Sequence, residues 1–130
     1  MLLALFPAAA TALWHPRRPP WTLDALGPDE IRLADAQNLQ NALWIDARAR
    51  TFYEKDHIPG AVLLNEDEWN TLLPPLAMQW DPARPVVVYC DRVTCDSSHT
   101  VAARLRKELG ATQVWVLKGG WQAWEEAGKK

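Results

Sequence analysis

Two cysteines, Cys90 and Cys95, form the part of the chain best suited to covalent chemistry. Cys90 follows the apolar run Val86–Tyr89, which Pro85 precedes, and such a β-branched run is typical of a buried strand. Cys95 lies in the polar segment that comes next. From residue 98 onward apolar side chains recur at helical spacing up to residue 109, and a glycine follows them. Cys90 is therefore expected where a strand stops, just before a helix.

This position favours a reactive sulfur at Cys90. Backbone N–H groups and the helix dipole at a strand-to-helix turn stabilise negative charge, which lowers the pKa of a thiol and makes it a nucleophile. The alternative is a small buried hydrophobe that ends the strand without reacting, as free cysteines often do. The polar loop behind Cys90 favours the nucleophile.

Cys95 leaves more alternatives open. In a curled loop the Cα atoms of the two cysteines could approach the distance of a disulfide, so Cys95 is a candidate resolving thiol. The alternative is a small loop residue that does not react. Together with His99 the two cysteines resemble part of a zinc pattern, but a closed site needs a fourth ligand, so no metal is predicted.

The elements that must position these residues alternate along the chain. The predicted strands are 31–33, 43–46, 61–64, 86–89 and 114–117, and the predicted helices lie at 34–42, after 51, at 69–76, at 98–109 and at 121–127. The strands are apolar on both faces. This pattern predicts an α/β fold, a parallel sheet of about five strands with helices on both faces.

Local signals refine two of these helices. Thr51 with Glu54, and Asn65 with Glu68, have the spacing of capping boxes. Pro74-Pro75 is expected to end or distort the helix that begins near residue 69.

Candidate site residues gather at one edge of the predicted sheet. In parallel sheets the site lies beyond the carboxyl ends of the strands. Asp46, Cys90 and Gly119-Gly120 each follow a different predicted strand. Three strands therefore deliver candidates to the same rim.

Composition and the N-terminal segment limit the number of domains and the kinds of partner that are expected. The 130 residues suit one domain, predicted at 22–130, and the net charge of −2 does not indicate a nucleic-acid partner. Residues 1–14 are apolar but too short to span a bilayer, and 15–21 form a Pro- and Arg-rich linker. The apolar arm is either membrane-associated, with the domain on the cytoplasmic side, or a segment that packs on the domain or frays.

Four ordered motifs show a resemblance to a known family: Asp46-Ala47-Arg48, His57-Ile58-Pro59-Gly60-Ala61, Tyr89-Cys90, and Leu117-Lys118-Gly119-Gly120-Trp121 with Trp124. From about residue 26 to 128 the chain resembles the rhodanese-like sulfurtransferases. The resemblance implies that Cys90 takes a sulfane sulfur from a donor as a persulfide and passes it to a thiol acceptor, without a cofactor. Asp56 stands where the family usually has glycine.

The loop after Cys90 departs from the common pattern of the family. It is longer and lacks glycine, and it resembles a less common Cys-x4-Cys branch. The sixth residue after Cys90 is Asp96, where related phosphatases have an arginine, so phosphatase activity is not expected. The backbone of Asp91, Arg92, Val93, Thr94, Asp96 and Ser97 is the predicted cradle for a persulfide.

The charged residues of the loop after Cys90 affect which sulfur donor is favoured. Arg92 attracts an anion, but Asp91 and Asp96 oppose one, so a protein or small-thiol persulfide is a fair alternative to thiosulfate. Of the supporting residues, Asp46 is expected to hydrogen-bond backbone. Arg48 is expected to pair with a carboxylate or face the donor, and His57 to stabilise a turn.

Three functional hypotheses follow. A sulfurtransferase needs Cys90 alone, a thiol oxidoreductase needs a Cys90–Cys95 disulfide cycle, and a non-catalytic docking module needs neither cysteine.

Overall fold

A parallel sheet lies at the centre of the molecule. The computed structural model describes residues 25–91 and 96–128, so the predictions for residues 1–21 and for Arg92 to Cys95 lie outside the described residues. In chain order the elements are β1 (Glu30–Ile31), α2 (Leu33–Gln37), β2 (Leu43–Asp46), α3 (Arg50–Lys55), β3 (Val62–Leu63), α4 (Trp69–Met78), β4 (Val86–Tyr89), α5 (Ser97–Leu109), β5 (Val114–Leu117) and α6 (Gly120–Gly128).

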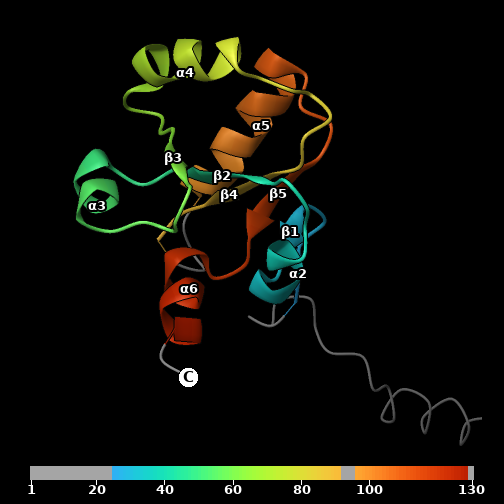
Figure 1. Cartoon of the computed structure of the whole chain (residues 1–130), viewed down its shortest axis with the longest axis vertical. Coiled ribbons are helices and arrows are strands. Elements are labelled where there is room, and N and C mark those ends of the chain that lie inside the picture. The colour runs from blue at the N-terminus through green and yellow to red at the C-terminus, as the bar shows by residue number, and fades with distance from the viewer. Residues whose placement is uncertain (1–24, 92–95, 129–130) are drawn as a thin grey trace, which may run out of the picture.

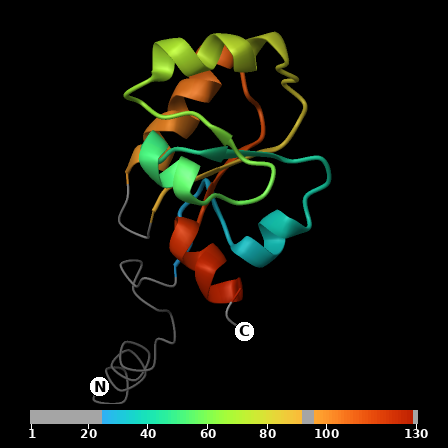
Figure 2. The same cartoon turned by 60° about the vertical axis from the view of Figure 1, so that its left-hand side comes forward.

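The strand order confirms the predicted fold class. The five strands lie in the order β1-β5-β4-β2-β3, and every neighbouring pair is parallel. Figure 1 shows α4 and α5 on one side of this sheet and α2 and α6 on the other, and the turned view in Figure 2 keeps them apart. All strands therefore end at the same edge, as parallel pairing requires.

Strand β4 forms the middle of both cores, because side chains alternate between the two faces of a strand. Val86 and Val88 point into the core beneath α4 and α5. Val87 and Tyr89 point into the core beneath α2 and α6, together with Trp121. All four β4 residues are fully buried. This burial anchors the strand that ends at Tyr89, directly before Cys90.

Two local predictions about the helices were wrong. Helix α3 begins at Arg50 with Ala49 as its N-cap, so Thr51 does not cap it. Glu54 lies 4.0 Å from Arg50 in an exposed ion pair instead. The predicted helix at 34–42 stops at Gln37, and Asn41 takes a left-handed conformation with φ of 58°.

Helix α4 differs from its prediction at its proline pair. Pro74 and Pro75 lie inside the helix, which continues to Met78. Prolines remove two backbone N–H donors from a helix. However, Leu73 and Leu76 pack against the core on either side of the pair, and this packing holds the last turn in place.

Candidate active site at the end of strand β4

The backbone of Cys90 is held by the first turn of α6. The N–H of Trp121 donates to the carbonyl oxygen of Cys90 at 2.7 Å, and the N–H of Gln122 donates to the carbonyl of Asp91 at 3.1 Å. Gly120 makes this approach feasible. Its φ is +53°, and a Cβ on it would lie 2.5 Å from the Cys90 carbonyl oxygen. The predicted supporting glycine therefore shapes the site through the backbone, because any side chain there would collide with Cys90.

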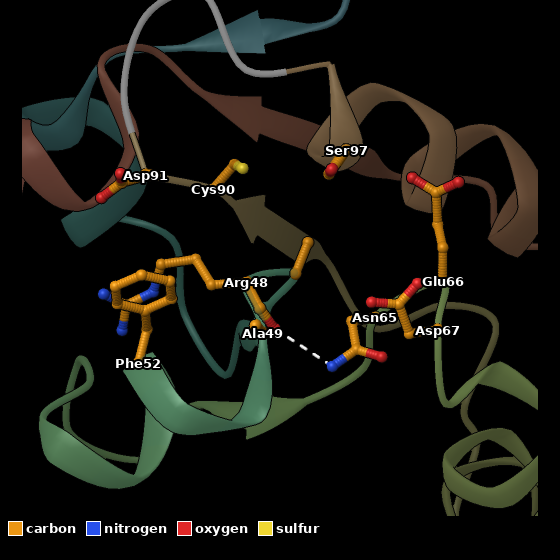
Figure 3. A pocket seen from close by; sticks show the side chains of 10 residues that line it. Arg48, Ala49, Phe52, Asn65, Glu66, Asp67, Cys90, Asp91 and Ser97 are labelled. Carbon is orange, nitrogen blue, oxygen red and sulfur yellow. Dashed lines mark hydrogen bonds between the residues drawn. The ribbon is translucent and has the colours of Figure 1, made fainter.

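The sulfur of Cys90 is at the wall of a cavity. Cys90 is 5% exposed, and it lines a cavity of about 350 Å³ together with Asp91 and Ser97. Figure 3 shows the Cys90 sulfur on the side that faces Ser97, the first residue of α5. Negative charge on the sulfur would thus lie near the positive end of a helix dipole. Cys90 is disulfide-bonded in this structure, so its thiol must be released before it can react.

The side chains of Asp46 and Arg48 form a buried pair next to this cavity. Arg48 Nη2 lies 2.7 Å from Asp46 Oδ2, and Arg48 Nε donates to both carboxylate oxygens of Asp46 at 3.0 and 3.1 Å. The backbone N–H of Arg48 also donates to Asp46 Oδ1 at 2.9 Å. Burial disfavours the charge on Arg48, but the hydrogen bonds and the charge of Asp46 outweigh it and raise the pKa of the guanidinium.

Tyr89 joins this pair to the neighbouring loop. Its hydroxyl donates to Asp46 Oδ2 at 2.8 Å and accepts from the backbone N–H of Ile58 at 3.1 Å. Burial first, and then the Asp46 carboxylate, raise the pKa of Tyr89 above its ordinary value. The Arg48 guanidinium lies 4.5 Å from the centre of the Trp121 ring, which completes the network on its other side.

Asn65 fixes the opposite wall of the cavity. Its side-chain amide donates to the carbonyl of Arg48 at 3.1 Å, the bond drawn in Figure 3. Its Oδ1 accepts from the N–H of Glu68 at 2.8 Å, so the predicted Asn65–Glu68 contact exists, one residue ahead of α4. Glu66 and Asp67 follow Asn65 and line the cavity with exposed carboxylates.

Two predicted site residues lie elsewhere. His57 stacks on Tyr53 with ring centres 3.9 Å apart, and its Nδ1 lies 2.8 Å from the Tyr53 carbonyl. Because a carbonyl only accepts, Nδ1 carries the proton, and this contact belongs to the turn after α3. Gly119, with φ of +80°, starts the turn into α6, and its carbonyl accepts from the N–H of Ala123 at 3.1 Å.

The histidine of the zinc-like pattern, His99, lies close to carboxylates at the start of β1. His99 lies 3.5 Å from Asp29 and 3.6 Å from Glu30, two carboxylates near β1. Across residues 25–91 and 96–128 no group of three or more His, Cys, Asp or Glu side chains is placed to hold a metal ion. Within the same ranges no helix has the length and apolar character needed to cross a membrane.

Sequence reasoning did not select Phe52, Glu66 or Asp67 as site residues, and it named Tyr89 and Asn65 only as parts of a family motif and a capping box. Tyr89 lies inside a buried apolar run, where its hydroxyl gives no signal. Glu66 and Asp67, by contrast, closely follow the carboxyl end of β3. The rule that selected Asp46 and Cys90 would have found them, had it been applied to that strand.

Comparison with known proteins decides the family. The Rhodanese-like domain family matches residues 31–127, which is most of the chain. The chain belongs to the rhodanese-like domain family. Its rhodanese-like domain includes Asp46, Cys90 and Gly120, so the whole rim of the sheet described above lies inside the matched range.

Solved structures share the fold of this rhodanese-like domain. A protein from Bacillus halodurans has 22% identity and a TM-score of 0.63, covering 76% of this chain and 72% of its own. A rhodanese-related protein from Thermoplasma volcanium has 19% identity and a TM-score of 0.57, covering 76% of this chain and 92% of its own. A Rhodopseudomonas palustris protein of unknown function, described as a possible tyrosine phosphatase, has 21% identity and a TM-score of 0.58, covering 87% of this chain and 96% of its own.

Proposed function

We propose that this rhodanese-like protein is a sulfurtransferase in which reduced Cys90 carries a sulfane sulfur as a persulfide. One observation carries the proposal. The Cys90 backbone is fixed by α6 while its sulfur lines a cavity of about 350 Å³ beside the first residue of α5. A fixed thiolate at the mouth of a cavity, near a helix N-terminus, is suited to attack an incoming sulfur.

The surrounding residues support this chemistry better than acid–base catalysis. Transfer of a sulfane sulfur to a thiolate needs no strong general base. The Asp46 carboxylate is taken up by Arg48 and Tyr89, which leaves it to position the site. A phosphatase, as suggested for one structural relative, would need an arginine at the sixth position after the cysteine, where this chain has Asp96.

Mass spectrometry of the intact protein tests the proposal. The protein is reduced with a thiol, freed of reductant, and incubated with thiosulfate or with a small-thiol persulfide. We expect the wild type and Cys95→Ser to gain one sulfur atom, and Cys90→Ser to gain none. A sulfur adduct that survives in Cys90→Ser would contradict the assignment.

A thiol oxidoreductase is the second candidate, and the disulfide-bonded state of Cys90 favours it. Cys95, the predicted resolving thiol, lies outside the described residues. In this case the wild type loses two hydrogen atoms on exposure to a persulfide and releases sulfide, and sulfur is trapped only in Cys95→Ser. If no donor produced an adduct or a disulfide, both catalytic hypotheses would be excluded, and the non-catalytic docking module would remain.

A further inference from the structure

The described walls around Cys90 are acidic. Asp91 lies on one side of the sulfur, and Glu66 and Asp67 lie on the other, as Figure 3 shows. All three are exposed. Among the described residues that line the cavity, the only cation is Arg48, which is bound to Asp46 and donates from Nη2 to the Asp56 carbonyl at 2.7 Å. A dianion such as thiosulfate would therefore meet like charges on both sides of the sulfur.

The cavity continues into a longer groove. A second cavity, of about 300 Å³, shares Arg48, Phe52 and Asp91 with the first. Phe52 lines both cavities, and 53% of its surface is exposed, so an apolar ring is accessible where the two cavities meet. Beyond it, Asp56 and Glu125 add two carboxylates and Lys55 adds one cation. The described groove is thus elongated, acidic, and apolar at its centre, and it is larger than a small inorganic donor requires.

We propose that the sulfur donor of Cys90 is a persulfidated cysteine in a basic segment of a partner protein. The inference rests on the proposed function and names the donor class. Lysine or arginine side chains flanking the donor cysteine would pair with Glu66 and Asp67 on one side and with Asp91 on the other. An apolar residue of the same segment would cover Phe52. Charge complementarity of this kind selects partners and speeds their encounter.

The transfer step conserves atoms and electrons. The Cys90 thiolate attacks the terminal sulfur of the donor's persulfide, and a new sulfur–sulfur bond forms. The donor's own sulfur–sulfur bond breaks, and its cysteine leaves as a thiolate. The proton of the donor's terminal sulfur stays on that sulfur, now at Cys90. A thiol reductant must first release Cys90 from its disulfide.

Charge-matched donors test the inference. Reduced wild-type protein is mixed with short peptides that carry one persulfidated cysteine flanked by lysines, by serines or by glutamates, and separately with thiosulfate. The rate at which Cys90 gains sulfur is followed by intact mass. We expect the lysine peptide to react roughly tenfold faster than the glutamate peptide at low ionic strength, and the difference to shrink in high salt.

A double variant, Glu66→Gln with Asp67→Asn, links the preference to the groove. We expect it to lower the lysine preference by about threefold or more and to speed the reaction with thiosulfate. The control, Asp35→Asn with Glu126→Gln, removes the same charge from exposed residues that line neither cavity and should keep the wild-type preference.

The experiment distinguishes failure of the donor inference from failure of the proposed function. Equal rates for all peptides, or thiosulfate as the fastest donor, would overturn the inference and leave the sulfurtransferase standing. No sulfur on Cys90 from any donor would overturn both.

Discussion

The backbone N–H of Trp121 donates a 2.7 Å hydrogen bond to the carbonyl oxygen of Cys90. This bond joins the end of β4 to the start of α6 across about 30 residues of chain. It fixes the backbone of the candidate nucleophile through an element that contributes no reactive group. Such a site is sensitive to changes in α6 that leave Cys90 itself untouched.

Gly120→Ala should damage the site without altering any polar group. The left-handed φ of +53° disfavours alanine, and its Cβ would lie 2.5 Å from the Cys90 carbonyl oxygen. We expect the free energy of unfolding to fall by about 2 kcal/mol or more in urea denaturation, and sulfur loading of Cys90 to slow. Gly128→Ala is the matched control, because a Cβ there meets no atom within 4 Å. If both variants behave like the wild type, the close approach of α6 to Cys90 is not important.

Asp46→Asn should be among the most damaging single changes. It leaves the Arg48 guanidinium, whose side chain is 4% exposed, without its carboxylate. Breaking a buried ion pair in this way costs about 3–5 kcal/mol, which urea denaturation at neutral pH measures. Glu54→Gln breaks an exposed pair with Arg50 and should leave the free energy of unfolding almost unchanged. Similar losses for the two variants would contradict the role assigned to Asp46.

Tyr89→Phe should destabilise the protein and change its alkaline behaviour. The variant leaves the N–H of Ile58 without its acceptor, a loss of about 1–3 kcal/mol. In the wild type the folded-state pKa of Tyr89 is raised above the unfolded value of about 10, so the folded protein holds this proton more tightly. Its contribution to stability is therefore complete below pH 10 and is lost as the pH rises above 10, by up to about 1.4 kcal/mol per pH unit.

Denaturation curves of the wild type and Tyr89→Phe, recorded between pH 8 and pH 11, separate the effect of Tyr89 ionisation from the effects of other titrating groups. The difference in unfolding free energy between the wild type and Tyr89→Phe should shrink above pH 10. A difference that stays constant over this range would show that Tyr89 ionises normally in the folded state.

Asn65→Ala should loosen the acidic wall of the cavity. The buried amide donates to the Arg48 carbonyl and accepts from the Glu68 N–H, so alanine leaves both groups unpaired. We expect a loss of about 1–3 kcal/mol in unfolding free energy and a higher KM for the sulfur donor. Asn70→Ala, at an exposed position in α4, should not destabilise the protein, since alanine favours helix. An unchanged KM in Asn65→Ala would mean that this wall does not contact the donor.

Much of the fold and part of the site followed from the sequence. Apolar runs at 43–46, 86–89 and 114–117 became strands with those bounds, because runs buried on both faces are unambiguous. The parallel order then placed Asp46, Cys90 and Gly120 at one edge. Local capping signals were weaker, and Thr51 does not cap its helix because that helix starts two residues earlier than predicted, at Arg50.

The sequence by itself determined which strand ends carry the chemistry, since strand burial and parallel pairing leave little freedom. Only the tertiary structure decided how those ends meet. It joined the Tyr89 hydroxyl to Asp46, brought Trp121 onto the Cys90 carbonyl, and set Glu66 and Asp67 opposite Asp91. These relations connect residues far apart in the chain. They depend on how helices and loops pack on the sheet, which no local pattern of residues records.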